Sequence, residues 1–238
     1  MSSSKLKARE DKQDRMLLLF DIDGTLLIKA VEAHRAAIHA AIHRVWHVPD
    51  PSAARVQAAG RTDPDIARAI LLQSDVSADR IDARWPDFKR AAAEEYAARV
   101  GEGLSRFLAP GIVEVLDALA ARDDVLLSLV TGNLEPIARL KLSRAGIGRY
   151  FPPGQGGFGS DHEDRSELPA IARRRAGRAG EPYPREQTIV IGDTPLDIAC
   201  ARADDVRCFA IATGPFGPDE LREADAVVGS ARELLALL

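Results

Sequence analysis

The spacing of apolar residues changes along the chain, and each spacing predicts a different kind of element. Residues 16–20 form an unbroken apolar run that ends at Asp21 and a Gly-Thr turn. Such a run, closed by turn residues, is typical of a buried strand in a parallel sheet. Between residues 29 and 107 apolar residues recur at helical spacing and β-branched runs are absent. This pattern predicts an all-helical segment.

After residue 111 predicted strands and helices alternate to the end of the chain. The apolar runs that predict strands are VLLSLV (125–130), TIVIGD (188–193), VRCFAIATG (206–214) and AVVG (226–229). Repeated βα units imply a parallel sheet with helices on both of its faces. The predicted fold class is therefore α/β, a doubly wound parallel sheet with an inserted all-helical domain.

The same pattern predicts the domain boundaries. Residues 16–28 and 108–238 form the α/β core, and residues 29–107 form the helical insertion, which is too long to be a single crossover. Residues 1–15 are mostly polar and charged, so we expect a disordered leader rather than a secretory signal.

Composition narrows the class of protein. The 238 residues are 46% hydrophobic and 29% charged, as in ordinary globular proteins. The net charge of −4 argues against a general nucleic-acid binder, and no apolar run approaches the roughly 18 residues that span a membrane. Cys200 and Cys208 lack partners at metal-ligand spacing, which indicates reduced thiols of a cytoplasmic protein.

Three predicted strands end in polar turns: FDIDGT, VTGN and IGDTPLD. In a doubly wound sheet, ligands bind beyond the carboxyl ends of the strands, so we expect these turns to share one site. Asp21 and Asp23 are two residues apart on an extended segment, which directs both carboxylates into one cavity. Two anions at close range need a cation or a shared proton.

The other two turns add candidate ligands. Asp193 can complete an oxygen-rich site for Mg²⁺, which takes few protein carboxylates. Asp197 lies in the first turn of the next helix, where it either helps to hold the metal through water or only favours the helix dipole. Residues 131–133, Thr-Gly-Asn, precede a helix and form either an anion cradle or an N-terminal cap.

The helical insertion contains a second candidate contact. In AAGRTDPDI, Arg61 and Thr62 are expected to touch the substrate if this loop closes over the site. The alternative is a helix entry, with Thr62 or Asp63 as the cap. The insertion also holds four histidines that we interpret as ordinary helix residues: His34, His39, His43 and His47.

The motifs DIDGTL (21–26), VTGN (130–133) and GDTPLD (192–197) resemble the first, second and fourth motifs of the haloacid dehalogenase-like phosphohydrolases. Their order and separation match, and the resemblance covers almost the whole chain after the leader. The helical insertion resembles the cap of the phosphoglycolate phosphatase and β-phosphoglucomutase branch. The resemblance implies a Rossmann-like core with a helical cap.

The resemblance also implies roles for single residues. Asp21 attacks the phosphoryl group and forms an aspartyl-phosphate, while Asp23 protonates the leaving oxygen and then deprotonates the hydrolytic water. Asp21, the backbone carbonyl of Asp23, and Asp193 hold Mg²⁺. Thr131, with Gly132 and Asn133, binds the phosphoryl group. A carboxylate can approach a phosphate dianion only if a metal and hydrogen-bond donors offset the charge.

The third motif of the family, usually Lys-Pro, has no counterpart here. The corresponding segment, SDHEDRSEL, offers Arg165 as its cation. The other candidate is Lys141, ten residues past Thr131 on a helix that leaves the site. About 13 Å of axial rise separates Lys141 from Thr131, which favours Arg165 as the catalytic cation.

The predicted function is a phosphatase that acts on a small phosphorylated metabolite, with no nucleic-acid or membrane partner. A sugar-phosphate mutase is the main alternative. Asp23 argues against a dehalogenase, and Lys29 and Lys89 have no context that favours a phosphonatase Schiff base. A non-catalytic binding protein of the same fold is the third possibility. The substrate and the oligomeric state are left open by the sequence.

Overall fold

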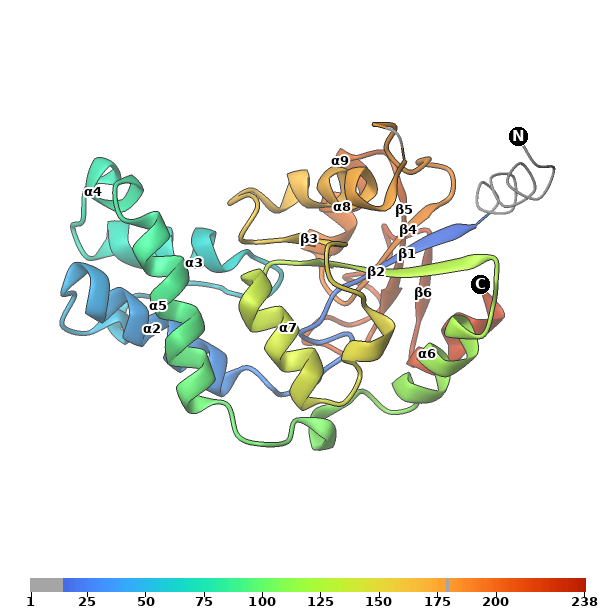
Figure 1. The fold of residues 1–238 in the computed structure, drawn as a ribbon, viewed down its shortest axis with the longest axis horizontal. Coiled ribbons are helices and arrows are strands. Elements are labelled where there is room, and N and C mark those ends of the chain that lie inside the picture. The colour runs from blue at the N-terminus through green and yellow to red at the C-terminus, as the bar shows by residue number, and fades with distance from the viewer. Residues whose placement is uncertain (1–14, 179) are drawn as a thin grey trace, which may run out of the picture.

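A computed structural model describes residues 15–178 and 180–238, and in these residues six parallel strands form one sheet with helices on both faces (Figure 1). The strands lie in the order β3-β2-β1-β4-β5-β6. Their bounds are β1 (Met16–Phe20), β2 (Val125–Thr131), β3 (Gly157–Phe158), β4 (Thr188–Gly192), β5 (Arg207–Ile211) and β6 (Ala226–Val228). From central β1 the chain builds first to one side and then to the other, which confirms the doubly wound α/β prediction.

The register of the sheet places three strand ends side by side. Phe20, the last residue of β1, pairs with Leu129 of β2 and with Ile191 of β4. The backbone N–H of Asp21 still donates to the Ile191 carbonyl, at 2.8 Å. The residues that follow β1, β2 and β4 therefore meet at one edge of the sheet.

The side chains of β1 alternate between two apolar layers because successive residues of a strand point to opposite faces. Leu18 and Phe20 join the cluster that contains the core helices α6 (Ile112–Ala120) and α7 (Glu135–Arg144). Leu17 and Leu19 join the cluster of α8 (Leu168–Ala176) and α9 (Pro195–Ala203). Both faces of β1 are thus covered, which explains its unbroken apolar sequence.

Four helices follow β1 and gather beside the core at the left of Figure 1. They are α2 (Glu32–Trp46), α3 (Asp63–Gln73), α4 (Ala78–Asp82) and α5 (Trp85–Arg99). The rings of Trp46 in α2 and Phe88 in α5 lie 5.7 Å apart. We call residues 29–107 the cap and the sheet with its helices the core; the domain division itself stays a prediction.

Some elements were not expected from the sequence. Strand β3 consists of Gly157 and Phe158 in a glycine-rich stretch, so no apolar run marks it, and it forms only by pairing with the end of β2. After β6, where the alternation of strands and helices predicts a closing helix, the chain forms a 3₁₀ helix. The 3₁₀ helices are η1 (Pro51–Ala53), η2 (Ser105–Phe107), η3 (Gly148–Tyr150), η4 (Arg165–Glu167) and η5 (Ala231–Ala236).

Other predictions concern the termini, the cysteines and the membrane. The predicted leader, residues 1–15, lies outside the described residues except for Arg15. Cys200 and Cys208 are buried free thiols, as predicted. Within the described chain, every helix is too short or too polar to cross a membrane.

Candidate active site

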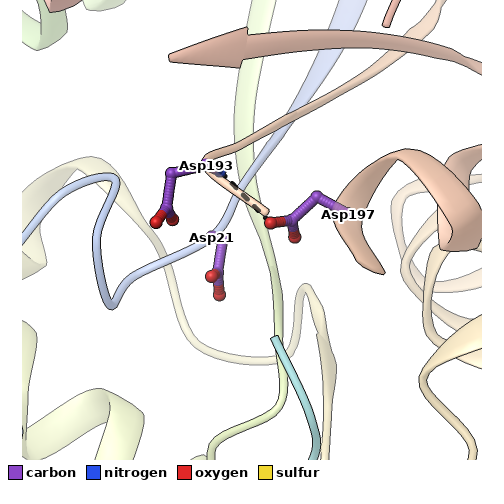
Figure 2. Close-up of side chains that lie close together, drawn as sticks. All are labelled: Asp21, Asp193 and Asp197. Atoms are coloured by element: carbon purple, nitrogen blue, oxygen red, sulfur yellow. Dashed lines mark hydrogen bonds between the residues drawn. The ribbon is translucent and has the colours of Figure 1, made fainter. Parts of the chain in front are cut away.

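Three carboxylates converge at the sheet edge where β1 and β4 end (Figure 2). Each of Asp21, Asp193 and Asp197 offers an oxygen, and these oxygens lie within 4.8 Å of one another. All three side chains are buried. The sequence predicts that Asp21 and Asp193 meet here, and the structure brings them together.

Asp21 has an electrostatic environment unusual for an aspartate. Burial raises its pKa to about 7, helped by the charges of Asp197 and Asp23 and opposed by Arg165. Arg165 Nη2 lies 3.4 Å from Asp21 Oδ1, and that oxygen has no hydrogen-bond partner among the described residues. The carboxylate therefore keeps an oxygen available for a cation or a reacting group.

Asp193 is held tightly against backbone on two sides. The Thr25 hydroxyl donates to Asp193 Oδ1 at 2.9 Å. A Cβ atom at Gly24 would lie 2.0 Å from the Asp193 carboxylate, and one at Gly214 would lie 1.7 Å from it, so only glycine fits at either position. Burial and the charges of Asp197 and Asp21 raise the pKa of Asp193 to about 8.

These observations test whether a divalent cation fits. Two buried carboxylates with raised pKa values face each other, and Asp21 Oδ1 and Asp23 Oδ1 are unpartnered within the described chain. A hard cation with oxygen ligands would offset this excess of negative charge. The carboxylates of Asp21 and Asp193 are thus suited to Mg²⁺, and the Asp23 backbone carbonyl as a further ligand stays a prediction.

Asp197 has a different set of contacts. Its Oδ2 accepts from the Thr194 hydroxyl at 2.7 Å and from the backbone N–H groups of Thr194 and Asp193, which completes a capping box at the start of α9. Its Oδ1 accepts from Arg165. Both oxygens are already partnered, which supports the helix-terminus role for Asp197.

Lys141 lies at the site, so the expectation that it is too distant is wrong. Its Nζ is 2.5 Å from Asp23 Oδ2 and 2.7 Å from Asn133 Oδ1. The helix that carries it begins only at Glu135, so about 9 Å of rise precedes Lys141 rather than 13 Å. Side chains on a helix also lean toward its N-terminus, which here points at the site.

Arg165 also reaches the site, as the sequence predicts. It extends from η4, pairs with Asp197 and Asp21, and donates to the Gly60 carbonyl of the cap at 2.9 Å. The site therefore contains two buried cations, Arg165 beside Asp21 and Lys141 beside Asp23. Which of them serves as the catalytic cation stays a prediction.

The turn after β2 forms a hydrogen-bonded unit. Asn133 Nδ2 donates to Asp23 Oδ2 at 2.8 Å and to Thr131 Oγ1 at 2.9 Å. Gly132 and Asn133 line the cavity described below, whereas Thr131, the third predicted phosphoryl contact, is fully buried and is not part of the lining. The capping alternative for Asn133 is not seen: no side-chain cap is found at the start of α7.

The two predicted substrate contacts of the cap lie differently. Arg61 lines the cavity and pairs with Asp65 at 2.5 Å. Thr62 is buried, caps α3 by accepting from the Asp65 N–H, and donates to the Glu163 carbonyl at 2.6 Å. Thr62 is absent from the cavity lining, so the structure supports its helix-entry role and not the predicted substrate contact.

Two residues near Asp23 were missed by the sequence analysis. His34 Nδ1 lies 3.0 Å from Lys141 Nζ, and its Nε2 lies 3.0 Å from Asp63 Oδ2. Asp63 also accepts from the Leu134 N–H at 2.7 Å. The available signal was position: His34 lies on the same helix face as the buried Ala37, Ile38, Ala41, Ile42 and Val45.

A cavity of about 580 Å³ lies between the cap and this sheet edge. Its floor contains Asp21, Asp23, Asp193 and Arg165. The cap contributes to its walls the cations Lys29, Arg35 and Arg61, the histidine His34, and the apolar side chains of Ile38 and Ile66. A cavity of this size holds a small metabolite.

Comparison with known proteins gives one family match and several similar folds. A family model described as haloacid dehalogenase-like hydrolase matches residues 18–202. Comparison with curated proteins gives no match.

Three similar solved structures illustrate the shared fold. A predicted phosphatase from Clostridium acetobutylicum is 16% identical, with 94% of this chain and 99% of that chain covered and a TM-score of 0.65. A predicted phosphoglycolate phosphatase from Haemophilus somnus is 19% identical, with 94% and 98% covered and a TM-score of 0.63. CbbY from Rhodobacter sphaeroides, in complex with xylulose-1,5-bisphosphate, is 21% identical, with 92% and 96% covered and a TM-score of 0.63.

Proposed function

The chain belongs to the haloacid dehalogenase-like hydrolase family, as its motifs predict, and from this premise we propose that it is a magnesium-dependent phosphatase for a small phosphorylated metabolite. The reaction passes through an aspartyl-phosphate on Asp21. The observation that carries the proposal is the Asp21 carboxylate, which is buried at the cavity floor with one oxygen unpartnered among the described residues and with Asp193 and Arg165 beside it.

Charge balance supports the role of Asp21 as nucleophile. A phosphate monoester is a dianion, and it can approach a carboxylate only where positive charge offsets the repulsion. Arg165 lies 3.4 Å from Asp21 Oδ1. Mg²⁺ held by Asp21, Asp193 and the Asp23 carbonyl would stabilise the charge on the transferred phosphoryl group. Gly132 and Asn133 line the cavity beside Asp23 and are the candidates to orient that group.

The contacts of Asp23 suit the base that activates the hydrolytic water. Its Oδ2 is held by Lys141 and Asn133, while its Oδ1 is unpartnered within the described chain. Burial alone would raise the pKa of Asp23, but Lys141 and His34 outweigh it and the pKa is lowered. The resting carboxylate is therefore ionised, which is the form that removes a proton from the hydrolytic water.

The direct test measures phosphate release from p-nitrophenyl phosphate, whose leaving group needs no proton, with Mg²⁺ or with a chelator. We expect turnover only with the metal. Asp21→Asn should lower kcat by about 10³-fold or more because it removes the nucleophile, and Asp23→Asn by roughly 10²- to 10⁴-fold. The exposed Asp124→Asn is the matched control. Full activity of Asp21→Asn would overturn the assignment of Asp21 as the nucleophile.

A panel of phosphorylated metabolites, ranked by kcat/KM, then identifies the substrate class. The bound xylulose bisphosphate of CbbY makes sugar phosphates the first compounds to include.

A sugar-phosphate mutase is the second candidate, because the cavity lies between the cap and the sheet edge and this arrangement can exclude water. Phosphorus-31 NMR separates the two functions. A phosphatase releases inorganic phosphate, whereas a mutase converts one phosphorylated sugar into another without phosphate release.

A further inference from the structure

A second space, which we call the side hollow, adjoins the cavity on the cap between α2, α3 and residues 52–58. Its volume is about 490 Å³. The residues that line both the cavity and the side hollow are Arg35, His39, Ala58 and Ile66. Neither Asp21 nor Asp23 belongs to the lining of the side hollow, so it leads from the cavity away from the proposed reacting groups.

The segment between α2 and α3 gives the side hollow one of its faces. Ala54, Val56 and Ala58 line it and alternate with exposed polar residues, as in an extended chain whose successive side chains point to opposite sides. Two hydrogen bonds hold this segment to the end of α3. The Arg55 N–H donates to Gln73 Oε1 at 3.2 Å, and Gln73 Nε2 donates to the Arg55 carbonyl at 3.3 Å. This face is therefore held in place by contacts within the cap.

Apolar side chains form much of the surface of the side hollow. Ile66 and Ile70, one turn apart on α3, line it together with Val56 and Ala54. Ile70 is buried, whereas the other three are half-buried and pack against the apolar core. Half-buried apolar side chains keep surface in contact with water, and covering that surface with an apolar group is favourable.

The boundary between the cavity and the side hollow has little charge. Burial and the charge of Arg35 lower the pKa of His39 below its usual 6.5, although Asp50 opposes this shift. The His39 imidazole is therefore mainly neutral at pH 7. Of the four residues that line both spaces, only Arg35 is then charged, so an apolar group can pass between them beside Ile66.

The cap wall of the cavity offers few partners for the hydroxyl groups of a sugar. His34 and Asp63 are paired with each other at 3.0 Å, and Arg61 is paired with Asp65. Among the described residues, the cap adds no Ser, Thr, Asn or Gln side chain to the lining of the cavity. A buried hydroxyl group without a partner costs free energy, whereas apolar side chains such as Ile38 can pack against hydrocarbon without that cost.

We propose that the substrate is a phosphate monoester with an extended apolar leaving group, an alkyl chain or an aromatic ring system, that reaches from the cavity into the side hollow. This inference rests on the proposed function and names its substrate class. The phosphoryl group lies at Asp21, and the leaving group runs past His39 and Ile66. Hydrolysis then gives inorganic phosphate and a hydrophobic alcohol or phenol. Ala36 and Val56, which line only the side hollow, become specificity-determining residues.

A series of n-alkyl phosphates tests the proposal, because the leaving alcohols have similar pKa values and differ mainly in apolar length. We expect kcat/KM to rise about two- to fourfold for each added methylene group, so that octyl phosphate exceeds butyl phosphate by about tenfold or more. Hexyl phosphate should also exceed glucitol 6-phosphate, which has the same number of carbon atoms but carries hydroxyl groups. Equal kcat/KM for octyl and butyl phosphate, or a preference for glucitol 6-phosphate, would overturn the proposal.

One substitution places a bulky side chain in the side hollow. Ala36 is exposed on α2 and lines the side hollow but not the cavity, so Ala36→Trp should reduce the space for the leaving group without disturbing the apolar core. We expect the ratio of kcat/KM for octyl over butyl phosphate to fall by about fivefold or more. Ala98→Trp, at an exposed alanine of α5 that lines neither space, is the matched control and should keep the wild-type ratio. A wild-type ratio in Ala36→Trp would show that the chain does not enter the side hollow.

Binding without turnover distinguishes this inference from the proposed function. Alkyl phosphonates have a P–C bond in place of the ester P–O bond, so calorimetry with Mg²⁺ present gives their Kd without hydrolysis. We expect octylphosphonate to bind about tenfold tighter than butylphosphonate, and Ala36→Trp to remove most of this difference. If this pattern is found but no monoester releases phosphate, the proposed function fails and the apolar binding site stands. If p-nitrophenyl phosphate is hydrolysed but alkyl length has no effect on Kd or kcat/KM, this inference alone fails.

Discussion

The two buried cations of the site, Arg165 and Lys141, differ in the residues that hold them. Arg165 pairs with Asp197 and Asp21, both on the core, and its only hydrogen bond to the cap among the described residues is to the Gly60 carbonyl. Lys141 pairs with Asp23, and its remaining acceptors are divided between the core and the cap. The charged partners of Arg165 are thus independent of the cap, whereas the hydrogen bonding of Lys141 is not.

This difference assigns different tasks to the two halves of the site. The Asp21 half, with Asp193 and Arg165, is built by the sheet edge, η4 and the start of α9, and its charged groups contact one another without the cap. The Asp23 half depends on a histidine of α2 and an aspartate of α3. In the proposed reaction, Asp21 serves phosphoryl transfer and Asp23 serves proton transfer, so the two tasks depend on different parts of the fold.

The strongest test of the comparison removes each cation in turn. Breaking a buried ion pair leaves an uncompensated charge, so Arg165→Met and Lys141→Met should each destabilise the fold by about 3–5 kcal/mol. We expect only Lys141→Met to increase hydrogen exchange of α2 and α3, because Lys141 contacts His34. Urea unfolding gives the first quantity and exchange mass spectrometry the second. An equal increase in the hydrogen exchange of α2 and α3 in both variants would contradict the idea that only the Lys141 side of the site depends on the cap.

The raised pKa values of Asp21 and Asp193 predict how the free energy of unfolding depends on pH and on bound metal. Folding raises the pKa of Asp21 from 3.8 to about 7 and that of Asp193 from 3.8 to about 8. The folded state therefore retains protons that the unfolded state has lost, and the stability of the metal-free protein should fall as pH rises from about 4 to 8.

Magnesium should reverse this loss because it takes the place of the protons. At pH 8 and a concentration 100-fold above its Kd, Mg²⁺ should stabilise the fold by about 2.7 kcal/mol, with a much smaller effect at pH 5. Thermal unfolding with and without Mg²⁺ measures both. The Asp193→Asn variant is the control and should show a flatter pH dependence. A metal effect that is equal at both pH values would argue against binding at these carboxylates.

A single methyl group should weaken the contact between cap and core. A Cβ atom at Gly132 would lie 2.1 Å from the Arg61 carbonyl, so Gly132→Ala must push the cap loop away. We expect kcat/KM to fall by about tenfold or more, since displacements near 1 Å are costly in catalysis. Gly101→Ala, where a Cβ meets nothing within 4 Å, is the control. Unchanged kcat/KM in Gly132→Ala would show that docking tolerates the displacement.

The smallest effect on catalysis is expected from a substitution in the wall of the cavity. Arg35 lines it from α2, is exposed, and forms no ion pair with any described residue. Arg35→Ala should raise KM roughly two- to fivefold, as expected for an exposed charge pair, and leave kcat unchanged, because Arg35 contacts neither Asp21 nor Asp23. Steady-state kinetics on the best metabolite of the panel checks this. A change in kcat alone would place Arg35 nearer to the reaction than proposed.

Much of the fold was predictable from local patterns. The unbroken apolar run of β1 and the alternation after residue 111 predict the parallel sheet, because a strand covered on both faces needs apolar residues at every position. The carboxyl ends of parallel strands share one edge, so the meeting of Asp21 and Asp193 follows from order along the chain. The two-residue β3 was not predictable, since it forms only by pairing with β2.

The sequence by itself determined the carboxylate side of this protein: a strand that delivers Asp21 and Asp23, and a strand end that delivers Asp193. Only the tertiary structure decided the cationic side. Lys141, His34 and Asp63 come from three helices, and their contact depends on how the cap docks on the core. A motif describes residues that are neighbours along the chain. The partners of a buried charge are instead determined by packing between elements that lie far apart in sequence.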